Sequence, residues 1–354
     1  MRQLAMGLAA AALLHLASLS GVGAATSTLE QVKTRGELIC GVNGGLAGFS
    51  SKDEAGNWTG FDVDFCRAVA AAIFNDASKV RFVPLSTSER FDALKTGKID
   101  VLARNSTRNL SRELDYSIDF AAITYFDGQG FMVPRSKGVL SALELAGSKV
   151  CVQGDTTSQQ NQADYFKANS MAFEVVLTAS TAESLEHYKK GDCSVITSDV
   201  SQLYAARLTL ADAGEHIVLP DVISKEPLGP AVRRDDPQWR ALVEWVHFAM
   251  LASEELGLSQ ATIDKAKAST RQNVQRLTGQ QGELGTHLGL TNDWALNIIR
   301  LVGSYGEVYE RNLGAESKLG IPRGLNQLWS MGGIQKMRRS KNTVKNARFS
   351  RASS

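Results

Sequence analysis

The polar stretch ARNSTRNLSRELDYS, residues 103–117, contains residue types that bind anions. It follows a predicted strand and begins a predicted short helix, where unpaired backbone N–H groups and the positive end of the helix dipole favour a negative charge. Asn105 and Thr107 add polar groups, and Arg112 can form two parallel hydrogen bonds with a carboxylate. The stretch therefore predicts a binding site for a carboxylate.

Catalytic and cofactor motifs are missing from the chain. G-x-S-x-G, H-E-x-x-H, the phosphate-binding loop and the dinucleotide-binding fingerprint do not occur. The lone Gly128-Gln129-Gly130 lacks the third glycine of that fingerprint, and we interpret it as a turn at a hinge. The sequence thus predicts no cofactor.

Two blocks of alternating strands and helices must position the polar stretch. In the first block we predict strands at 38–42, 80–83 and 99–102 and helices at 61–74 and 88–95. In the second we predict strands at 149–152, 172–177 and 194–197, helices near 161–168 and 180–189, and a further helix starting near Asp199. The pattern predicts two α/β lobes with mostly parallel sheets, and ligand binding at the carboxyl ends of the strands.

Two extended apolar segments, 131–134 and 228–232, are predicted to connect the lobes, so that the second lobe is inserted into the first. We expect one lobe to comprise 26–132 and 232–330, and the other 133–231. From Trp239 onward the chain is predicted to be helical and to pack on the first lobe. Two hinged lobes form a cleft that can close on a ligand.

The ends of the chain differ from the rest in composition. Met1, Arg2 and Gln3 precede an uncharged run, which predicts a signal peptide at 1–25 cleaved near Ala25, with a buried helix or a membrane anchor as the alternative. We therefore expect a soluble periplasmic protein. Residues 331–354 contain seven basic residues and no acidic one, and we expect a disordered tail there, with contact to anionic lipid as the alternative. Without that segment and Arg2, 31 basic residues face 37 acidic ones, which argues against nucleic acid as the main partner.

Four cysteines are an even number in a chain predicted to enter an oxidising compartment. We favour the disulfides Cys40–Cys66 and Cys151–Cys193, because each pair falls within one predicted lobe; four buried free thiols are the alternative. No C-x-x-C occurs and the five histidines are scattered, so the sequence predicts no metal site.

Several segments together resemble one family: the amino-acid-binding proteins of ABC importers, which have the periplasmic binding protein type II fold. The resemblance extends from about Leu29 to Trp329 and is strong in GFDVDFCRAVAAAIF, RFDALKTGKIDVLARNSTRNLSR, FDGQGFMV, CVQGDTTSQQ and GDCSVITSD. The segment CGVNGGLAGFSSKDEAGNWTGFDVD is particularly similar to the subgroup of general L-amino-acid binders and binders of glutamate, glutamine, aspartate and asparagine.

The resemblance implies roles for eight residues. Arg112 matches the arginine that holds the ligand α-carboxylate, with Asn105, Thr107 and Thr157 as neighbouring contacts, and Asp199 matches the acid that pairs with the α-ammonium. Asn43, Thr87 and Arg90 match contacts to the ligand side chain. The alternatives are a surface position for Arg112, a helix N-cap for Asp199, and a structural role for Arg90. Phe49 is either an apolar wall of the site or a core residue, and Asn109 stands where many relatives have threonine.

The implied function is that of a monomeric transport receptor, which closes its lobes on an amino acid and delivers it to a permease driven by an ATPase. The opposed charges of Arg112 and Asp199, one in each lobe, suit a zwitterion, because a buried charge left unpaired is costly. An enzyme on the same fold, such as a dehydratase, is the alternative. It needs a general acid in the cleft, whereas Glu183 and Glu186 are expected to be solvated. A third possibility is a partner of a membrane sensor.

Overall fold

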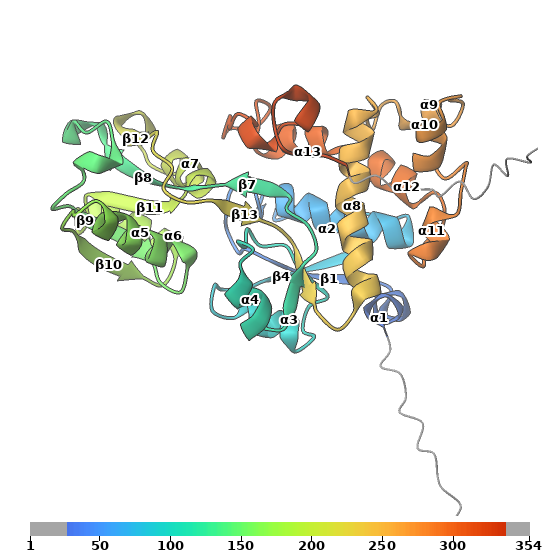
Figure 1. Ribbon diagram of the computed structural model, residues 1–354, viewed down its shortest axis with the longest axis horizontal. Coiled ribbons are helices and arrows are strands. Elements are labelled where there is room, and N and C mark those ends of the chain that lie inside the picture. Colours follow the sequence, from blue (N-terminus) through green and yellow to red (C-terminus); the bar gives the residue numbers. More distant parts are fainter. Residues whose placement is uncertain (1–26, 338–354) are drawn as a thin grey trace, which may run out of the picture.

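The computed structural model describes residues 27–337; the predicted signal peptide and the segment 338–354 lie outside this range. Figure 1 shows two α/β lobes joined by a pair of extended strands, with further helices on the far side of one lobe. The predicted architecture of two lobes is confirmed. No helix in the range 27–337 has the length and apolar character needed to cross a bilayer.

Lobe 1 is built on a five-stranded sheet in the order β4-β1-β5-β14-β6. Strands β1 (Leu38–Val42), β4 (Val80–Pro84) and β5 (Val101–Leu102) are parallel, and β14 (Ala231–Arg233) is antiparallel to β5 and to β6 (Ile118–Phe120). Its first helices are α1 (Thr28–Arg35), α2 (Phe61–Phe74), α3 (Arg90–Lys95) and α4 (Leu110–Asp115), and β2 (Ser51–Lys52) pairs with β3 (Trp58–Thr59). Asn43 and the 103–109 segment therefore follow the carboxyl ends of neighbouring parallel strands.

Lobe 2 repeats this arrangement with the strand order β10-β9-β11-β8-β12. The strands are β8 (Gln129–Pro134), β9 (Lys149–Gln153), β10 (Glu174–Thr178), β11 (Val195–Asp199) and β12 (His216–Val218); the helices are α5 (Thr157–Ala168), α6 (Thr181–Lys190) and α7 (Val200–Leu208). Strands β9, β10 and β11 are parallel. Thr157 begins the helix after β9 and Asp199 ends β11, so both lie at the carboxyl edge of this sheet.

The connection between the lobes differs from the prediction. The crossing strands are β7 (Tyr125–Asp127) and β13 (Glu226–Leu228), which pair with each other in antiparallel fashion. The segment 131–134, predicted as a connection, belongs instead to β8, an inner strand of the lobe 2 sheet. A fully buried strand and an apolar connection have the same sequence pattern, because neither shows alternation of polar and apolar residues.

The C-terminal helices pack on lobe 1, as predicted (Figure 1). They are α8 (Pro237–Glu255), α9 (Ile263–Ala266), α10 (Gln272–Leu277), α11 (Leu284–His287), α12 (Trp294–Leu301) and α13 (Tyr305–Asn312). Helix α12 lies against α2 and α8, and all three contribute to one large apolar core. The fold continues past the predicted boundary at 330: Gln335 is buried and donates to the carbonyl of Thr124 at 3.2 Å. The rest of the predicted tail lies outside the described range.

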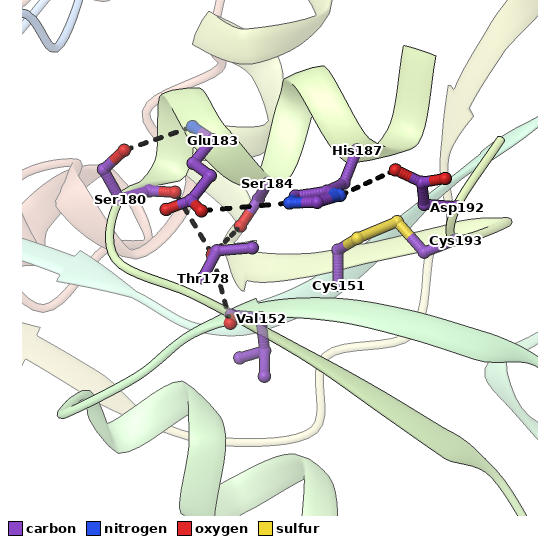
Figure 2. Close-up of a disulfide and its surroundings, with 9 residues drawn as sticks. All are labelled: Cys151, Val152, Thr178, Ser180, Glu183, Ser184, His187, Asp192 and Cys193. Atoms are coloured by element: carbon purple, nitrogen blue, oxygen red, sulfur yellow. Dashed lines mark hydrogen bonds and ion pairs between the residues drawn. A yellow bond between two sulfur atoms is a disulfide. The ribbon is translucent and has the colours of Figure 1, made fainter. Parts of the chain in front are cut away.

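Both disulfides join the predicted partners. Cys40 of β1 is bonded to Cys66 of α2, and Cys151 of β9 to Cys193 in the turn before β11, with Cα–Cα distances of 6.3 and 5.8 Å. Figure 2 shows the second bond beside helix α6, where His187 and Asp192 are 2.7 Å apart. Each disulfide ties a strand of one lobe to an adjacent element of the same lobe.

Candidate functional site

All eight predicted contacts line one small cavity between the lobes, which we call the inner cavity. Six of them come from lobe 1, and Thr157 and Asp199 come from lobe 2. Its volume is about 30 Å³, enough for about one water molecule. It adjoins a wider space of about 910 Å³, the outer groove, and the two share the lining residues Thr87, Arg90, Thr107, Arg112, Thr156 and Thr157.

Arg112 is held in place by its own segment. The Asn109 side chain accepts from the backbone N–H of Arg112 at 2.9 Å and so caps α4, which explains an asparagine at this position. The guanidinium donates to the carbonyl of Thr107 at 2.7 Å and lies 5.4 Å from the ring of Phe91. Burial lowers the pKa of Arg112, whereas the nearby Glu226 and Asp199 favour its charged form. Arg112 therefore lines the cavity and is not a surface residue of the helix.

Asn105 and Thr107 lie before α4, which begins only at Leu110. They are therefore not part of a helix N-terminus, in contrast to the prediction. Asn105 adopts a positive φ of 35°, and the carboxylate of Asp62 accepts from its backbone N–H at 2.9 Å. Burial raises the pKa of Asp62 to about 7, although this hydrogen bond and Arg104 act in the opposite direction. Asp62, at the start of α2, thus positions Asn105.

Arg90 differs from the other arginines of the cavity. Within the described range it has no hydrogen-bond or ion-pair partner, and its Nε is buried and unpaired. Its guanidinium lies 4.7 Å from the ring of Phe91. Burial, and then the charges of Arg112 and Arg104, lower the pKa of Arg90 well below its usual value. A buried cation without a partner is costly, so a ligand that brings an anion to Arg90 would stabilise it.

Arg104 and Thr87 make a polar link across the cleft. Arg104 donates to the carbonyl of Leu85 at 2.9 Å and to the Thr87 hydroxyl at 3.2 Å. Gln153, at the end of β9 in lobe 2, donates to the same hydroxyl at 2.7 Å. Thr87 therefore connects the lobes in addition to lining the cavity. Arg104 was not predicted from the sequence, where the one available signal is a charged residue shortly after an apolar strand.

Asp199 occupies the position before α7, but its side chain does not cap that helix. It is 4 % exposed and accepts from Gln202 at 2.9 Å. Burial, followed by the charges of Asp127 and Glu226, raises the pKa of Asp199 well above its usual range. A carboxylate in these surroundings is stabilised by a cation, which supports the ammonium-binding role over the N-cap alternative.

Glu226, on the crossing strand β13, is the main residue that sequence analysis missed. It is 2 % exposed and accepts four hydrogen bonds from side chains of both lobes and the hinge. The donors are Thr107 at 2.5 Å, Thr157 at 3.0 Å, Asn161 at 2.7 Å and Ser224 at 2.6 Å. The hydroxyls of Thr107 and Thr157, expected to bind the ligand, therefore donate to Glu226 in this structure. The sequence offered one signal for this residue: Glu226 is an acid at the start of the largely apolar segment EPLGPAV.

The contacts of Asn43 and Phe49 show which of the two lines the site. Asn43 donates to the side chain of Asn105 at 3.3 Å and faces the cavity. Phe49 is 1 % exposed and packs on Phe61 and Tyr125, with ring centroids 6.2 and 5.4 Å away, so it is a core residue.

The acids considered for a dehydratase lie outside the inner cavity. Glu183 accepts from the backbone N–H of Ala179 at 2.7 Å and lies beside His187 (Figure 2), and Glu186 pairs with Lys189. Neither of these two acids is therefore placed to act as the general acid in the inner cavity.

Known proteins match this chain over most of its length. The profile of the bacterial extracellular solute-binding proteins, family 3, matches residues 38–262. The general L-amino acid-binding periplasmic protein AapJ of Rhizobium johnstonii is 50 % identical over 88 % of this chain and 92 % of its own. The glutamate/glutamine/aspartate/asparagine-binding protein BztA of Rhodobacter capsulatus is 47 % identical over 90 % and 95 %.

A solved structure agrees with these matches. A periplasmic binding protein from Brucella ovis with glutathione bound superposes with a TM-score of 0.86 at 48 % identity, covering 87 % of this chain and 98 % of its own. The chain therefore belongs to the bacterial extracellular solute-binding proteins, family 3.

Proposed function

We propose that this protein binds L-amino acids in the periplasm and delivers them to an ABC importer. The observation that carries the proposal is that a buried guanidinium from lobe 1, that of Arg112, and a buried carboxylate from lobe 2, that of Asp199, line one cavity. An α-amino acid has the two complementary charges on one carbon atom. The names of the similar proteins AapJ and BztA support the same ligand class.

Binding requires the lobes to move. An inner cavity of about 30 Å³ is too small for an amino acid, so the ligand enters when the lobes separate and is enclosed when they return. Arg112 then holds the α-carboxylate, with Asn105, Thr107 and Thr157 around it, and Asp199 holds the α-ammonium. Because closure removes water, a molecule that lacks either charge leaves a buried partner unpaired.

Selection of the ligand side chain falls to Asn43, Thr87 and Arg90. Asn43 is neutral, which suits amides and a range of side chains, whereas Arg90 favours a side chain that ends in an anion. The protein itself catalyses nothing. In its closed form, as a monomer, it docks on a membrane permease that a cytoplasmic ATPase drives.

Calorimetry against the twenty L-amino acids tests the proposal, after partial unfolding has removed any bound ligand. We expect Arg112→Ala to lower the affinity for every ligand by at least about 30-fold, because all of them share the α-carboxylate. Arg300→Ala is the matched control, since Arg300 pairs with Asp264 on the C-terminal helices. No heat with any amino acid would refute the function, and retained affinity in Arg112→Ala would refute the role of Arg112.

A further inference from the structure

The inner cavity adjoins the outer groove, with which it shares six lining residues, and the groove's volume of about 910 Å³ is in the range of pockets that hold ligands larger than an amino acid. The groove has polar walls that include Ser88, Ser111 and Gln160. A ligand held by Arg112 therefore has room to extend from the inner cavity along a surface that can form hydrogen bonds.

Arg90 lies at the junction of the two spaces, since it lines both. It is 4 % exposed and has no hydrogen-bond or ion-pair partner among the described residues. A further pocket, which shares Arg104 with the inner cavity but no residue with the groove, has mainly apolar walls that include Leu46 and Leu185. Its arginine, Arg104, already donates to the carbonyl of Leu85 and the hydroxyl of Thr87. Within residues 27–337, Arg90 is thus the buried cation without an anion, and it lines the groove but not the apolar pocket.

The charges of Arg112 and Asp199 limit which larger molecules the site can bind. In the proposed function, Arg112 and Asp199 together hold a carboxylate and an ammonium that share one carbon atom. An ordinary peptide has its free ammonium and free carboxylate on different residues, so it cannot satisfy both. A compound extended through its side chain keeps the intact α-amino acid head. A γ-glutamyl peptide is such a compound, and its terminal carboxylate supplies a second anion.

We propose that the site accepts γ-glutamyl peptides, with the α-amino acid head in the inner cavity, the peptide extension in the outer groove and the second carboxylate paired with Arg90. This inference rests on the proposed function and extends it from free amino acids to a class of small peptides. The glutathione in the Brucella ovis structure belongs to the same class of compound.

The test uses two isomers, γ-glutamylglycine and α-glutamylglycine, titrated calorimetrically into the refolded wild-type protein beside glutamate and glutamine. The isomers have the same atoms and charges and differ only in linkage. We expect γ-glutamylglycine to bind within about tenfold of glutamate, and α-glutamylglycine to bind at least about 30-fold more weakly, because one of its charges is left unpaired. This comparison requires no variant to fold.

A variant then tests Arg90. In Arg90→Gln, we expect the affinity for γ-glutamylglycine to fall at least about 30-fold more than that for glutamine, which lacks the second carboxylate. Arg81→Gln, at an exposed arginine of the edge strand β4 that pairs with Glu37 and lines neither the inner cavity nor the outer groove, should change neither affinity.

The outcomes separate the two proposals. Binding of glutamate and glutamine without γ-glutamylglycine would overturn the inference and leave the proposed function intact. Equal binding of the two isomers would overturn the requirement for an α-amino acid head, and equal losses for both ligands in Arg90→Gln would overturn the role of Arg90. Failure of all four compounds to bind would count against the proposed function and, with it, the inference.

Discussion

Replacement of Glu226 by glutamine tests how a single buried carboxylate connects the two lobes. One oxygen of Glu226 accepts from Thr107 and Thr157, and the other from Asn161 and Ser224. Glutamine has the same shape, but one of the oxygens becomes an NH2 group. That group can face the two threonines, because a hydroxyl can rotate and accept, whereas the amide nitrogen of Asn161 can only donate.

The expected cost follows from the four hydrogen bonds. A hydrogen bond to a charged group contributes about 1.5–3 kcal/mol and one between neutral groups about 1 kcal/mol, so loss of the charge weakens each bond by roughly 1 kcal/mol. Removal of the charge relieves repulsion with Asp199 and Asp127 and lowers the cost of burial, which outweighs the lost attraction to Arg112. We expect Glu226→Gln to lose about 2 kcal/mol of unfolding free energy, and Glu226→Ala about 4 kcal/mol, since alanine leaves four donors without an acceptor.

Urea denaturation of the ligand-free protein at pH 7 measures these losses. The matched control is Glu174→Gln, at an exposed acid of β10 that pairs with Lys149, where we expect a change below about 0.5 kcal/mol. Small-angle scattering should also show a larger radius of gyration for Glu226→Ala, because its donors in lobe 1 and lobe 2 no longer share a partner. Wild-type stability in Glu226→Gln, or equal losses in the two variants, would refute the reasoning.

Two further predictions concern stability. Burial raises the pKa of Asp62 from 3.8 to about 7, so the folded state binds an extra proton in that range and the group's contribution to stability falls as pH rises from about 4 to 7. Between about pH 4 and 7 the unfolding free energy of Asp62→Asn should therefore rise relative to that of the wild type by about 2–4 kcal/mol. His247, whose pKa is lowered to about 4, changes stability with pH in the opposite direction, but it is present in both proteins and cancels in the comparison. Parallel stability curves would contradict the prediction. The disulfide Cys151–Cys193 joins residues 42 apart, so the double variant Cys151→Ala/Cys193→Ala should lose about 4 kcal/mol in urea denaturation, and an unchanged midpoint would argue against this contribution.

Three of the eight cavity residues, Asn105, Thr107 and Arg112, could be predicted from residue types and their place after a strand, whereas the other five were implied by the resemblance to a family. Asn43, Asn105 and Thr107 follow strands of one parallel sheet, and Thr157 and Asp199 lie at the strand ends of the other. The carboxyl ends of parallel strands meet at one edge, so such residues gather without knowledge of any long-range contact. The disulfides were predictable for a related reason, since each pair lies within one block of strands and helices.

The tertiary structure decided which of these side chains are already engaged and which need a ligand. Thr107 and Glu226 are 119 residues apart, and no local pattern indicates that the threonine donates to this acid. Position along the chain does not distinguish Arg104, which has acceptors, from Arg90, which has none among residues 27–337. The sequence thus determined which chemical groups reach the cleft, whereas only the packing of two lobes and a hinge determined their partners, because hydrogen bonds and desolvation depend on contacts between segments far apart in the chain.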